Sequence, residues 1–282
     1  MPPVKVSILM LTYNRPMHIG RAIDSVYRQS FQDWELIIVQ DGSSPHTAAI
    51  VSGRAAGEPR VRYFKRGTVG PISEASNFGL SQAAGEYIAI LDDDDCWSCP
   101  DKLARQVEFL DCHPDYVACG GGYVLVDENG HERGVFLKPE HDTDIRSGAL
   151  LANPIANSTA MFRRLTGGQP ALYDTSMKGY ADWDFWLAMG AAGKLYNFPE
   201  VFARYALWEG GGSFWQQKVN ARAGLRIVCR HYREYRGLCL ALPLAAAHYA
   251  YACLPPGIRR HSYHTLSSFK KSLAATASEK HA

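Results

Sequence analysis

The stretch Tyr87-Ile88-Ala89-Ile90-Leu91-Asp92-Asp93-Asp94-Asp95 decides how this chain is interpreted. Its apolar part is rich in β-branched residues, which is typical of a buried strand. The run of aspartates that follows would repel itself at the end of that strand, which raises the carboxyl pKa values unless a cation neutralises them. Carboxylate oxygens favour a hard ion such as Mg²⁺ or Mn²⁺, and magnesium is typically held by carboxylates together with substrate phosphates. The stretch therefore predicts a metal–diphosphate site, with a solvated acidic turn as the alternative.

The composition limits the class of protein. The 282 residues suffice for one large or two small domains, and 46% hydrophobic with 21% charged residues is ordinary for a soluble globular protein. A formal net charge of +2 gives no overall field that favours a nucleic-acid partner. The odd count of 7 cysteines, and a strand-like start without a secretory signal, favour free thiols in a reducing cytoplasm. Cys96 and Cys99 are spaced like a zinc or redox pair, but no second close pair completes that pattern.

Strand and helix patterns alternate through residues 1–100. Strands are predicted over 4–11, 35–39, 61–64 and 87–91, and helices over 18–30, 46–54 and 71–84. Repeated βα units predict a parallel sheet with helices on both faces. Ligands bind such sheets beyond the carboxyl ends of the strands. The polar clusters at 12–15, 41–44 and 92–95 all fall there, which strengthens the metal–diphosphate interpretation.

The pattern beyond residue 100 is more mixed. Helices are predicted over 101–112, 142–151 and 181–192, and strands over 158–163, 195–198 and 201–205. Residues 116–126 and 131–136 predict a hairpin, because Asn129-Gly130 between them is a strong hairpin turn. We find neither an internal repeat nor a long linker.

The tail from about Phe214 has a different character. Arginines recur there at helical spacings, namely Arg222, Arg226, Arg230, Arg233 and Arg236. An almost wholly apolar run over 238–254 follows, but it is short for a membrane span and contains Pro243. A basic helix beside an apolar one suits the surface of a membrane. The alternative is a helical pair that packs on the domain.

Four segments, in the expected order, resemble family 2 glycosyltransferases of the GT-A fold. They are residues 6–15, Gln40-Asp41-Gly42-Ser43-Ser44, residues 77–95 and Asp182-Trp183-Asp184-Phe185-Trp186-Leu187. The match covers about residues 4–205, and several pieces in register are far more specific than one. The resemblance implies an α/β, Rossmann-like GT-A domain with a mostly parallel sheet flanked by helices. Residues 1–100 would form its nucleotide-sugar-binding half, 101–213 its acceptor-binding half, and 214–282 a helical tail that could associate with a membrane.

The resemblance also implies roles for individual residues. The donor would be a nucleoside-diphosphate sugar, for which we expect a UDP-sugar, and the cofactor Mn²⁺ or Mg²⁺. Donor binding is assigned to Thr12, Tyr13, Arg15, Asp41, Asn77, Asp92 and Asp94, and metal binding to Asp95 and Asp94. Asp92 would bind the ribose or hold its loop, while Asp93 fills the variable position and is expected to be solvated.

Asp182 is implied as the general base that takes a proton from the acceptor hydroxyl, with inversion at the anomeric carbon. Asp184 lies two residues further on and is expected to serve as a cap or ion-pair partner. Trp183 could stack on a sugar face, and Trp186 is expected in the core.

The chain departs from the family pattern at several positions. Gln40 replaces the first acid of the second segment, which leaves the base preference open. Ala181 replaces the Glu that usually precedes the catalytic Asp. Trp208 stands where relatives often carry His, and residues 210–212 suggest a loop that closes over the donor.

The sequence therefore predicts an inverting, metal-dependent glycosyltransferase with a saccharide or lipid-linked acceptor, acting in cell-surface polysaccharide synthesis. We expect it in the cytoplasm, with peripheral contact at the inner face of the membrane through the tail. A sugar nucleotidyltransferase is one alternative, but it expects a glycine-rich loop after the first strand, and Thr12 to Pro16 contains no glycine. The other alternative is a non-catalytic nucleotide-sugar-binding protein.

Overall fold

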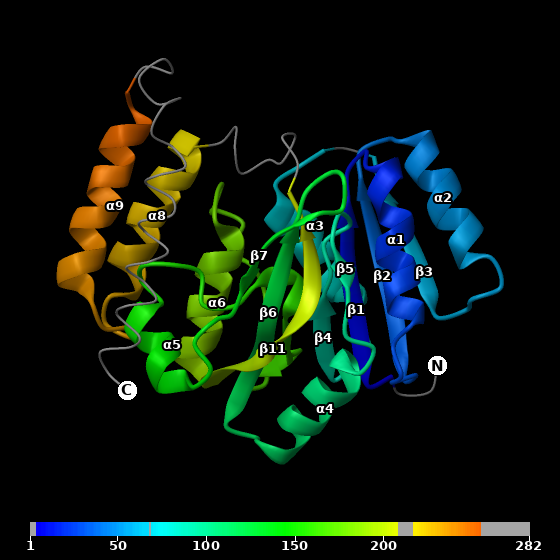
Figure 1. The fold of residues 1–282 in the computed structure, drawn as a ribbon, viewed down its shortest axis with the longest axis horizontal. Coiled ribbons are helices and arrows are strands. Elements are labelled where there is room, and N and C mark those ends of the chain that lie inside the picture. The colour runs from blue at the N-terminus through cyan, green and yellow to red at the C-terminus, as the bar shows by residue number, and fades with distance from the viewer. Residues whose placement is uncertain (1–3, 68, 208–216, 255–282) are drawn as a thin grey trace.

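The computed structural model describes residues 4–67, 69–207 and 217–254 (Figure 1). Within them, a nine-stranded sheet has the order β3-β2-β1-β4-β8-β6-β11-β5, with β7 also paired to β6. The strands of this sheet are β1 (Val6–Thr12), β2 (Trp34–Asp41), β3 (Val61–Arg66), β4 (Tyr87–Ile90), β5 (Cys96–Trp97), β6 (Tyr116–Val126), β7 (Glu132–Phe136), β8 (Met161–Arg163) and β11 (Lys194–Ala206). A separate short hairpin joins β9 (Leu165–Thr166) to β10 (Gln169–Pro170).

The first half of the sheet is parallel, as predicted. Strand β1 pairs in parallel with β2 and β4, and β2 pairs in parallel with β3. The second half is mixed, because β8 runs antiparallel to both β4 and β6 while β6 and β11 are parallel. The predicted strands over 195–198 and 201–205 form one strand, β11, whose register shifts between Phe198 and Val201. Such an irregularity accommodates Pro199, which cannot donate to the ladder.

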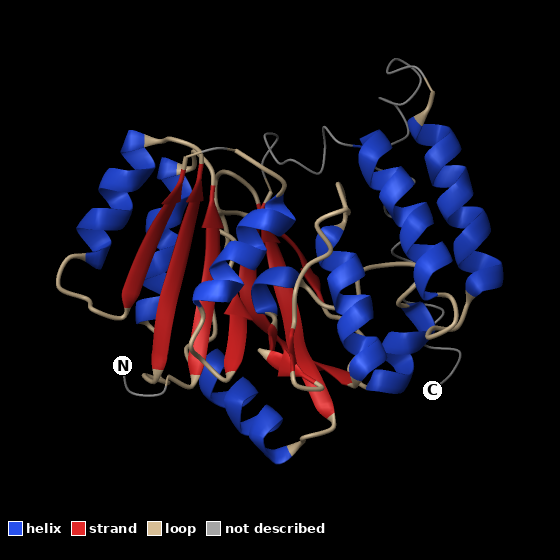
Figure 2. Cartoon of the chain, turned by 180° about the vertical axis from the view of Figure 1, so that it is seen from behind, coloured by secondary structure: helices blue, strands red, loops and turns tan. Residues whose placement is uncertain are grey.

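Helices cover both faces of the sheet (Figures 1 and 2). They are α1 (Pro16–Tyr27), α2 (Pro45–Ala55), α3 (Ile72–Gln82), α4 (Lys102–Cys112), α5 (Asp142–Gly148), α6 (Ala181–Ala192), α8 (Gln217–His231) and α9 (Leu238–Ala252), with a 3₁₀ turn η1 (Asn157–Thr159). Alternate residues of each strand face opposite sides. Ile8 of β1 therefore packs with α1, α2 and α4, whereas Leu9 packs with α3 and α6. The expected α/β fold is confirmed.

The predicted hairpin is also present. Strands β6 and β7 pair antiparallel, and Gly130 in the connecting turn has a φ of 82°. That left-handed conformation carries little cost for glycine, which explains the turn signal in the sequence.

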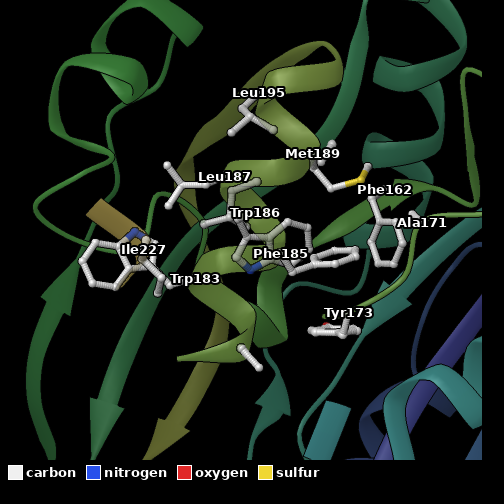
Figure 3. Packing of buried hydrophobic residues seen from close by; sticks show 14 of the residues in the cluster. Phe162, Ala171, Tyr173, Trp183, Phe185, Trp186, Leu187, Met189, Leu195 and Ile227 are labelled. Carbon is white, nitrogen blue, oxygen red and sulfur yellow. The ribbon is translucent and has the colours of Figure 1, made fainter. Parts of the chain in front are cut away.

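The tail forms a helical pair that packs on the domain. Ile227 of α8 and Ala241 of α9 belong to the same buried cluster as Trp186 of α6 (Figure 3). Asp184 of α6 is buried and anchors α8, because its carboxylate lies 2.9 Å from His231 Nε2 and 3.2 Å from Arg230 Nη1. The expected ion-pair role of Asp184 is thus confirmed. Among the described residues, no helix is both long and apolar enough to cross a bilayer.

We expect Asp184→Ala to lower the free energy of unfolding by about 2 kcal/mol, because it leaves the buried ring nitrogen of His231 without its hydrogen-bond partner. Asp24→Ala is the matched control, since Asp24 pairs with Arg54 on the surface and its loss costs at most about 1 kcal/mol. Urea unfolding followed by circular dichroism measures both values. Equal stability losses in the two variants would show that Asp184 does not fasten α8.

Candidate active site

The carboxyl ends of the parallel strands meet at one edge of the sheet. Thr12 at the end of β1 pairs with Gln40, next to Asp41 at the end of β2. On the other side of β1, Leu9 pairs with Ile90, the last residue of β4 before the acid run. The topology therefore brings the polar clusters after these strands to one edge, as the alternating pattern predicted.

The acid run forms a turn after β4, closed by a hydrogen bond from the Asp95 N–H to the Asp92 carbonyl at 3.1 Å. Asp93 and Asp95 are only 2% and 5% exposed, whereas Asp92 and Asp94 are partly exposed. Asp92 and Asp94 are thus the accessible acids of the run, and the expectation that Asp93 is solvated was wrong.

Arg15 neutralises part of the run. It follows β1 in a turn where Asn14 adopts a φ of 50°, and its Nη1 lies 2.8 Å from Asp93 Oδ1 and 2.6 Å from Asp94 Oδ2. This ion pair explains how Asp93 can be buried, since a buried carboxylate needs a partner. In this structure the guanidinium of Arg15 is engaged by aspartates.

The 3₁₀ turn η1 holds the acid run from the other side. Asn157 Nδ2 donates to both Asp92 oxygens, at 3.1 and 3.2 Å. Ser158 Oγ accepts from the Asp92 N–H at 3.1 Å and donates to Asp95 Oδ2 at 2.6 Å. The N–H of Ala206 donates to Asp95 Oδ1 at 3.0 Å. Asp95 is therefore buried and accepts a protein hydrogen bond at each oxygen, and its role as a metal ligand stays a prediction.

Side chains from distant elements hold η1 in place. Trp97 Nε1 donates to the Ser158 carbonyl at 2.6 Å, and the Ser158 N–H donates to the Tyr205 hydroxyl at 2.8 Å. Gln106 Nε2 donates to the Thr159 carbonyl at 2.9 Å. These residues come from β5, β11 and α4, so the acid run is supported by contacts that no local pattern indicates.

The acid run carries more negative charge than its surroundings neutralise, and the pKa values of its buried carboxyls are raised. Burial raises the pKa of Asp92 to about 7, an effect that the charges of Asp94, Asp93 and Asp182 increase and the Asn157 hydrogen bond opposes. Burial likewise raises the pKa of Asp93 to about 6, against the charge of Arg15, and raises the pKa of Asp95 well above its usual range. A cation bound beside these carboxyls would stabilise their charged forms, because it offsets the repulsion between like charges.

The cation fits the residues that surround Asp92. Asn157 Oδ1 is buried and finds no hydrogen-bond partner among the described residues, so a neutral oxygen stands unused beside Asp92. Carboxylate and amide oxygens are the donors that a hard divalent ion prefers. Within the described ranges, no three His, Cys, Asp or Glu side chains form a metal site, so an ion at Asp92 would also need oxygens from the phosphates of a donor.

Asp182 lies in the first turn of α6, after Tyr180 in a left-handed conformation with φ of 49°. Its Oδ2 accepts from Asn153 Nδ2 at 2.7 Å, and the Asn153 carbonyl accepts from Lys138 Nζ at 2.7 Å. Burial raises the pKa of Asp182, while backbone N–H groups of the helix start and the charge of Lys138 oppose the rise. A carboxyl tuned in this way is suited to proton transfer.

Asp182 lies within electrostatic reach of the acid run. The charge of Asp182 acts on Asp92, and the charges of both act on the buried hydroxyl of Tyr173, whose pKa is raised mainly by burial. Tyr173 stacks on Phe185 of α6 at a ring-centroid distance of 4.3 Å (Figure 3). Sequence reasoning missed Tyr173, Asn153 and Lys138, because their places depend on how α6 meets the sheet.

The end of β2 carries a second polar group. Asp41 Oδ2 accepts from the Gly70 N–H at 2.9 Å, and Asp41 Oδ1 lies 3.4 Å from Arg66 Nη1. Tyr13 is 57% exposed beside Gly42, where a Cβ atom would come within 2.7 Å of Val69. The exposed ring of Tyr13 and the cation of Arg66, which the sequence did not single out, therefore lie at the same edge as the acid run.

Two residues that were expected to contact the ligand make hydrogen bonds within the protein. Asn77 donates through Nδ2 to the Tyr173 carbonyl at 2.9 Å and accepts at Oδ1 from the Tyr173 N–H at 2.8 Å, so its amide fastens Tyr173, and its contact with a donor stays a prediction. Trp183 is buried and donates from Nε1 to the Ala149 carbonyl at 2.8 Å, so it does not present a face to a sugar. Trp186 lies in the core, as expected. Trp208 and the loop 210–212 lie outside the described residues.

Comparison with known proteins decides the family. The family model described as glycosyl transferase family 2 matches residues 7–165. The chain belongs to glycosyltransferase family 2. This glycosyltransferase is 32% identical over 223 residues to the putative glycosyltransferase EpsE of Bacillus subtilis, covering 74% of this chain and 75% of EpsE. It is 30% identical over 252 residues to an uncharacterized protein of Mycobacterium tuberculosis, covering 86% of this chain and 67% of that protein.

Solved structures confirm the GT-A fold of this glycosyltransferase. The mannosyltransferase PcManGT from Pyrobaculum calidifontis, in complex with GDP-Man and Mn²⁺, superposes with a TM-score of 0.66 at 20% identity, covering 98% of this chain and 86% of that one. Residues 1–349 of TarS from S. aureus, in complex with UDP-GlcNAc, give a TM-score of 0.62 at 18% identity, covering 88% and 72%. At these identities the likeness concerns the fold.

Proposed function

We propose that this glycosyltransferase moves a sugar from a nucleoside-diphosphate sugar, a UDP-sugar in our assignment, to a hydroxyl of a saccharide or lipid-linked acceptor, with inversion. The observation that carries the proposal is an accessible acid pair, Asp92 and Asp94, with a tuned carboxyl, Asp182, within electrostatic reach. Residues 1–100 supply the first group and residues 101–213 the second, in keeping with a donor half and an acceptor half.

Asp92 and Asp94 are the residues that we propose to hold Mn²⁺ or Mg²⁺. They are the accessible acids of the run, whereas Asp95 is buried and bonded to Ser158 and Ala206. A bound divalent ion neutralises charge on the departing diphosphate. Asn157 orients Asp92 by donating to both of its oxygens, as residues around metal ligands commonly do.

Arg15, Tyr13 and Asp41 are proposed to bind the donor. Arg15 pairs with Asp94, so a cation at Asp94 would free its guanidinium to meet a phosphate, which it can bind in a bidentate manner. The exposed ring of Tyr13 offers a surface for the base, and Asp41 an acceptor for it. Thr12 is buried next to this edge and shapes it. Gln40 donates to the Gly42 carbonyl at 3.2 Å and thereby holds the turn after β2.

Asp182 is proposed to activate the acceptor. Its Oδ2 is held by Asn153, which leaves Oδ1 as the oxygen that takes the proton when the hydroxyl attacks the anomeric carbon. The bond to the diphosphate breaks on the opposite face of the sugar, so the configuration inverts. The transition state resembles an oxocarbenium ion, which the surrounding carboxylates stabilise.

Thermal unfolding of the protein in the presence of different sugar nucleotides tests this proposal. We expect UDP-sugars with Mn²⁺ to raise the unfolding midpoint by roughly 5–10 °C at saturating ligand, and GDP-sugars to raise it less. The solved structures of similar fold hold different bases, since TarS is in complex with UDP-GlcNAc and PcManGT with GDP-Man.

The same assay separates the alternatives. Pyrophosphate release from a nucleoside triphosphate and a sugar phosphate would indicate a nucleotidyltransferase. Protection without release of UDP in the presence of saccharide or lipid-linked acceptors would indicate a non-catalytic binding protein. Protection by GDP-sugars alone would reverse our assignment of the base.

A further inference from the structure

The outer face of α9 is a continuous apolar surface. We define it as the exposed residues Cys239, Leu240, Leu242, Pro243, Ala246, Ala247, Ala250, Cys253 and Leu254. At 3.6 residues per turn these positions fall on a single arc about 160° wide. The opposite side carries Ala241, Ala245 and Ala252, which are buried. No Asp, Glu, Lys or Arg occurs from Leu238 to Leu254, so an apolar helix faces outward without the charged residues that surface helices usually carry.

This face lies at one end of the molecule. In Figures 1 and 2, α9 is the outermost helix beyond α8, at the end of the domain opposite α2. Leu240, Leu242 and Leu254 are 42%, 38% and 41% exposed. Contiguous exposed apolar patches of this kind mark surfaces that bind a partner or a membrane.

The same end of the chain is basic. Residues 217–254 contain Lys218, Arg222, Arg226, Arg230, Arg233 and Arg236 against one acid, Glu234. Arg226 and Arg230 reach back to Ser176 and Asp174 of the domain. Arg222, Arg233 and Arg236 are exposed, and the last two lie in the turn that leads into α9. Exposed cations therefore flank the beginning of the apolar face.

The charge of the chain is divided along its length. Residues 1–216 hold 19 Lys and Arg against 26 Asp and Glu, while residues 217–282 hold 11 against 2. The small net charge of +2 thus hides an acidic domain and a basic tail. Among the described residues, 217–254 hold 6 Lys and Arg against 1 Glu, so an anionic surface attracts the end that carries α8 and α9 and repels the rest of the domain.

We propose that the outer face of α9 docks on an anionic lipid surface, with its leucines in the interface and Arg233 and Arg236 on the headgroups. A helix with an apolar face and adjacent cations lies in the plane of such an interface. A second copy of the chain is a poorer occupant, because a symmetric pair through α9 places two basic tails against each other. The docking needs neither donor nor acceptor, and it deepens the proposed function by placing lipid-linked acceptors beside the enzyme.

Flotation of the full chain with vesicles tests the proposal. We expect binding to vesicles of one part phosphatidylglycerol and two parts phosphatidylcholine, and little binding to phosphatidylcholine alone. Leu240→Gln/Leu254→Gln should weaken the partition by at least about 10-fold, since buried leucines contribute most of the apolar area. Arg233→Gln/Arg236→Gln should weaken it by about 25-fold, at about five-fold per arginine.

A matched control keeps the outcome decisive. Val135→Gln/Leu165→Gln changes two residues that are 59% and 44% exposed on strands β7 and β9, and it should bind vesicles like the unchanged protein. Equal loss in the leucine variant, the arginine variant and this control, or no binding to anionic vesicles at all, overturns the proposal. So does a dimer in solution that Leu240→Gln/Leu254→Gln converts to a monomer, because a second copy then covers the face. UDP binding is measured on the same samples. It shows whether the proposed transferase site binds its ligand, independently of vesicle binding.

Discussion

Asp182→Asn is expected to lower the turnover number of transfer by at least about 100-fold while UDP affinity stays within about three-fold of the unchanged protein. The amide is isosteric with the carboxylate but cannot accept a proton, so only the step that needs a base is lost. Asn153, which donates to Asp182 Oδ2, is the nearest partner that must adjust. Single-turnover measurements with a UDP-sugar and acceptor, beside UDP titration, separate chemistry from binding.

The pH dependence gives this prediction a second readout. Burial raises the pKa of Asp182, so the acid limb of kcat/KM should lie above the pKa of a free aspartate near 3.9. The rate falls as pH drops through that raised pKa, because the base becomes protonated. Asn153 stabilises the charged form, and Asn153→Ala should therefore move the limb to higher pH. A limb that Asn153→Ala leaves in place would argue against Asp182 as the base.

Asp184→Asn serves as the matched control on the same helix. Asp184 faces His231 and Arg230 rather than the acid run, so its amide variant should keep a near-normal turnover per folded molecule. Near-normal turnover in Asp182→Asn as well would refute the assignment and leave the acceptor proton to another group.

The sequence predicted those features of the fold that depend on local pattern. The alternation of apolar runs and polar turns placed Thr12, Asp41 and the acid run at one sheet edge, and the structure brings them there. The roles of the individual aspartates in the acid run were predicted less well. The turn from Asp92 to Asp95, closed by a backbone hydrogen bond, decides which acids stay accessible, and a run of identical residues carries no pattern that predicts it.

Other parts of the site could not have been predicted. Asn157 and Ser158 reach the acid run from 65 and 66 residues further along the chain. Strand β5 is too short for a periodicity signal, yet its Trp97 holds Ser158. Such contacts arise only when the antiparallel β8 brings η1 next to β4, a pairing that no local propensity specifies.

Asp94→Asn should abolish the gain in UDP affinity that Mn²⁺ provides, a loss of at least about 100-fold at saturating metal. Magnesium-type sites rely on one or two carboxylates, so removing one charge removes much of the ion's binding. Isothermal titration of UDP with and without Mn²⁺ measures the gain directly. In the variant, the two titrations should coincide.

Asp95→Asn distinguishes this site from the one that the family resemblance implied. Asp95 is 5% exposed and already accepts from Ser158 and Ala206, so its neutral amide should keep most of the Mn²⁺-dependent affinity. Loss of the metal effect in Asp95→Asn, with retention in Asp94→Asn, would return the ion to Asp95. A UDP affinity that ignores Mn²⁺ in the unchanged protein would remove the metal from the proposal.

The metal effect should also depend on pH in a defined direction. Burial raises the pKa of Asp92 to about 7, so without metal this carboxyl takes up a proton as the pH falls through 7. A cation must displace that proton, which makes Mn²⁺ binding weaken below pH 7 by up to about 10-fold per pH unit. Asn157→Ala removes a hydrogen bond that favours the charged form of Asp92, and should shift the weakening to higher pH. Mn²⁺ affinity that is flat from pH 8 to 6 would mean that Asp92 is not a ligand, because a carboxyl with this pKa cannot bind the ion without releasing its proton.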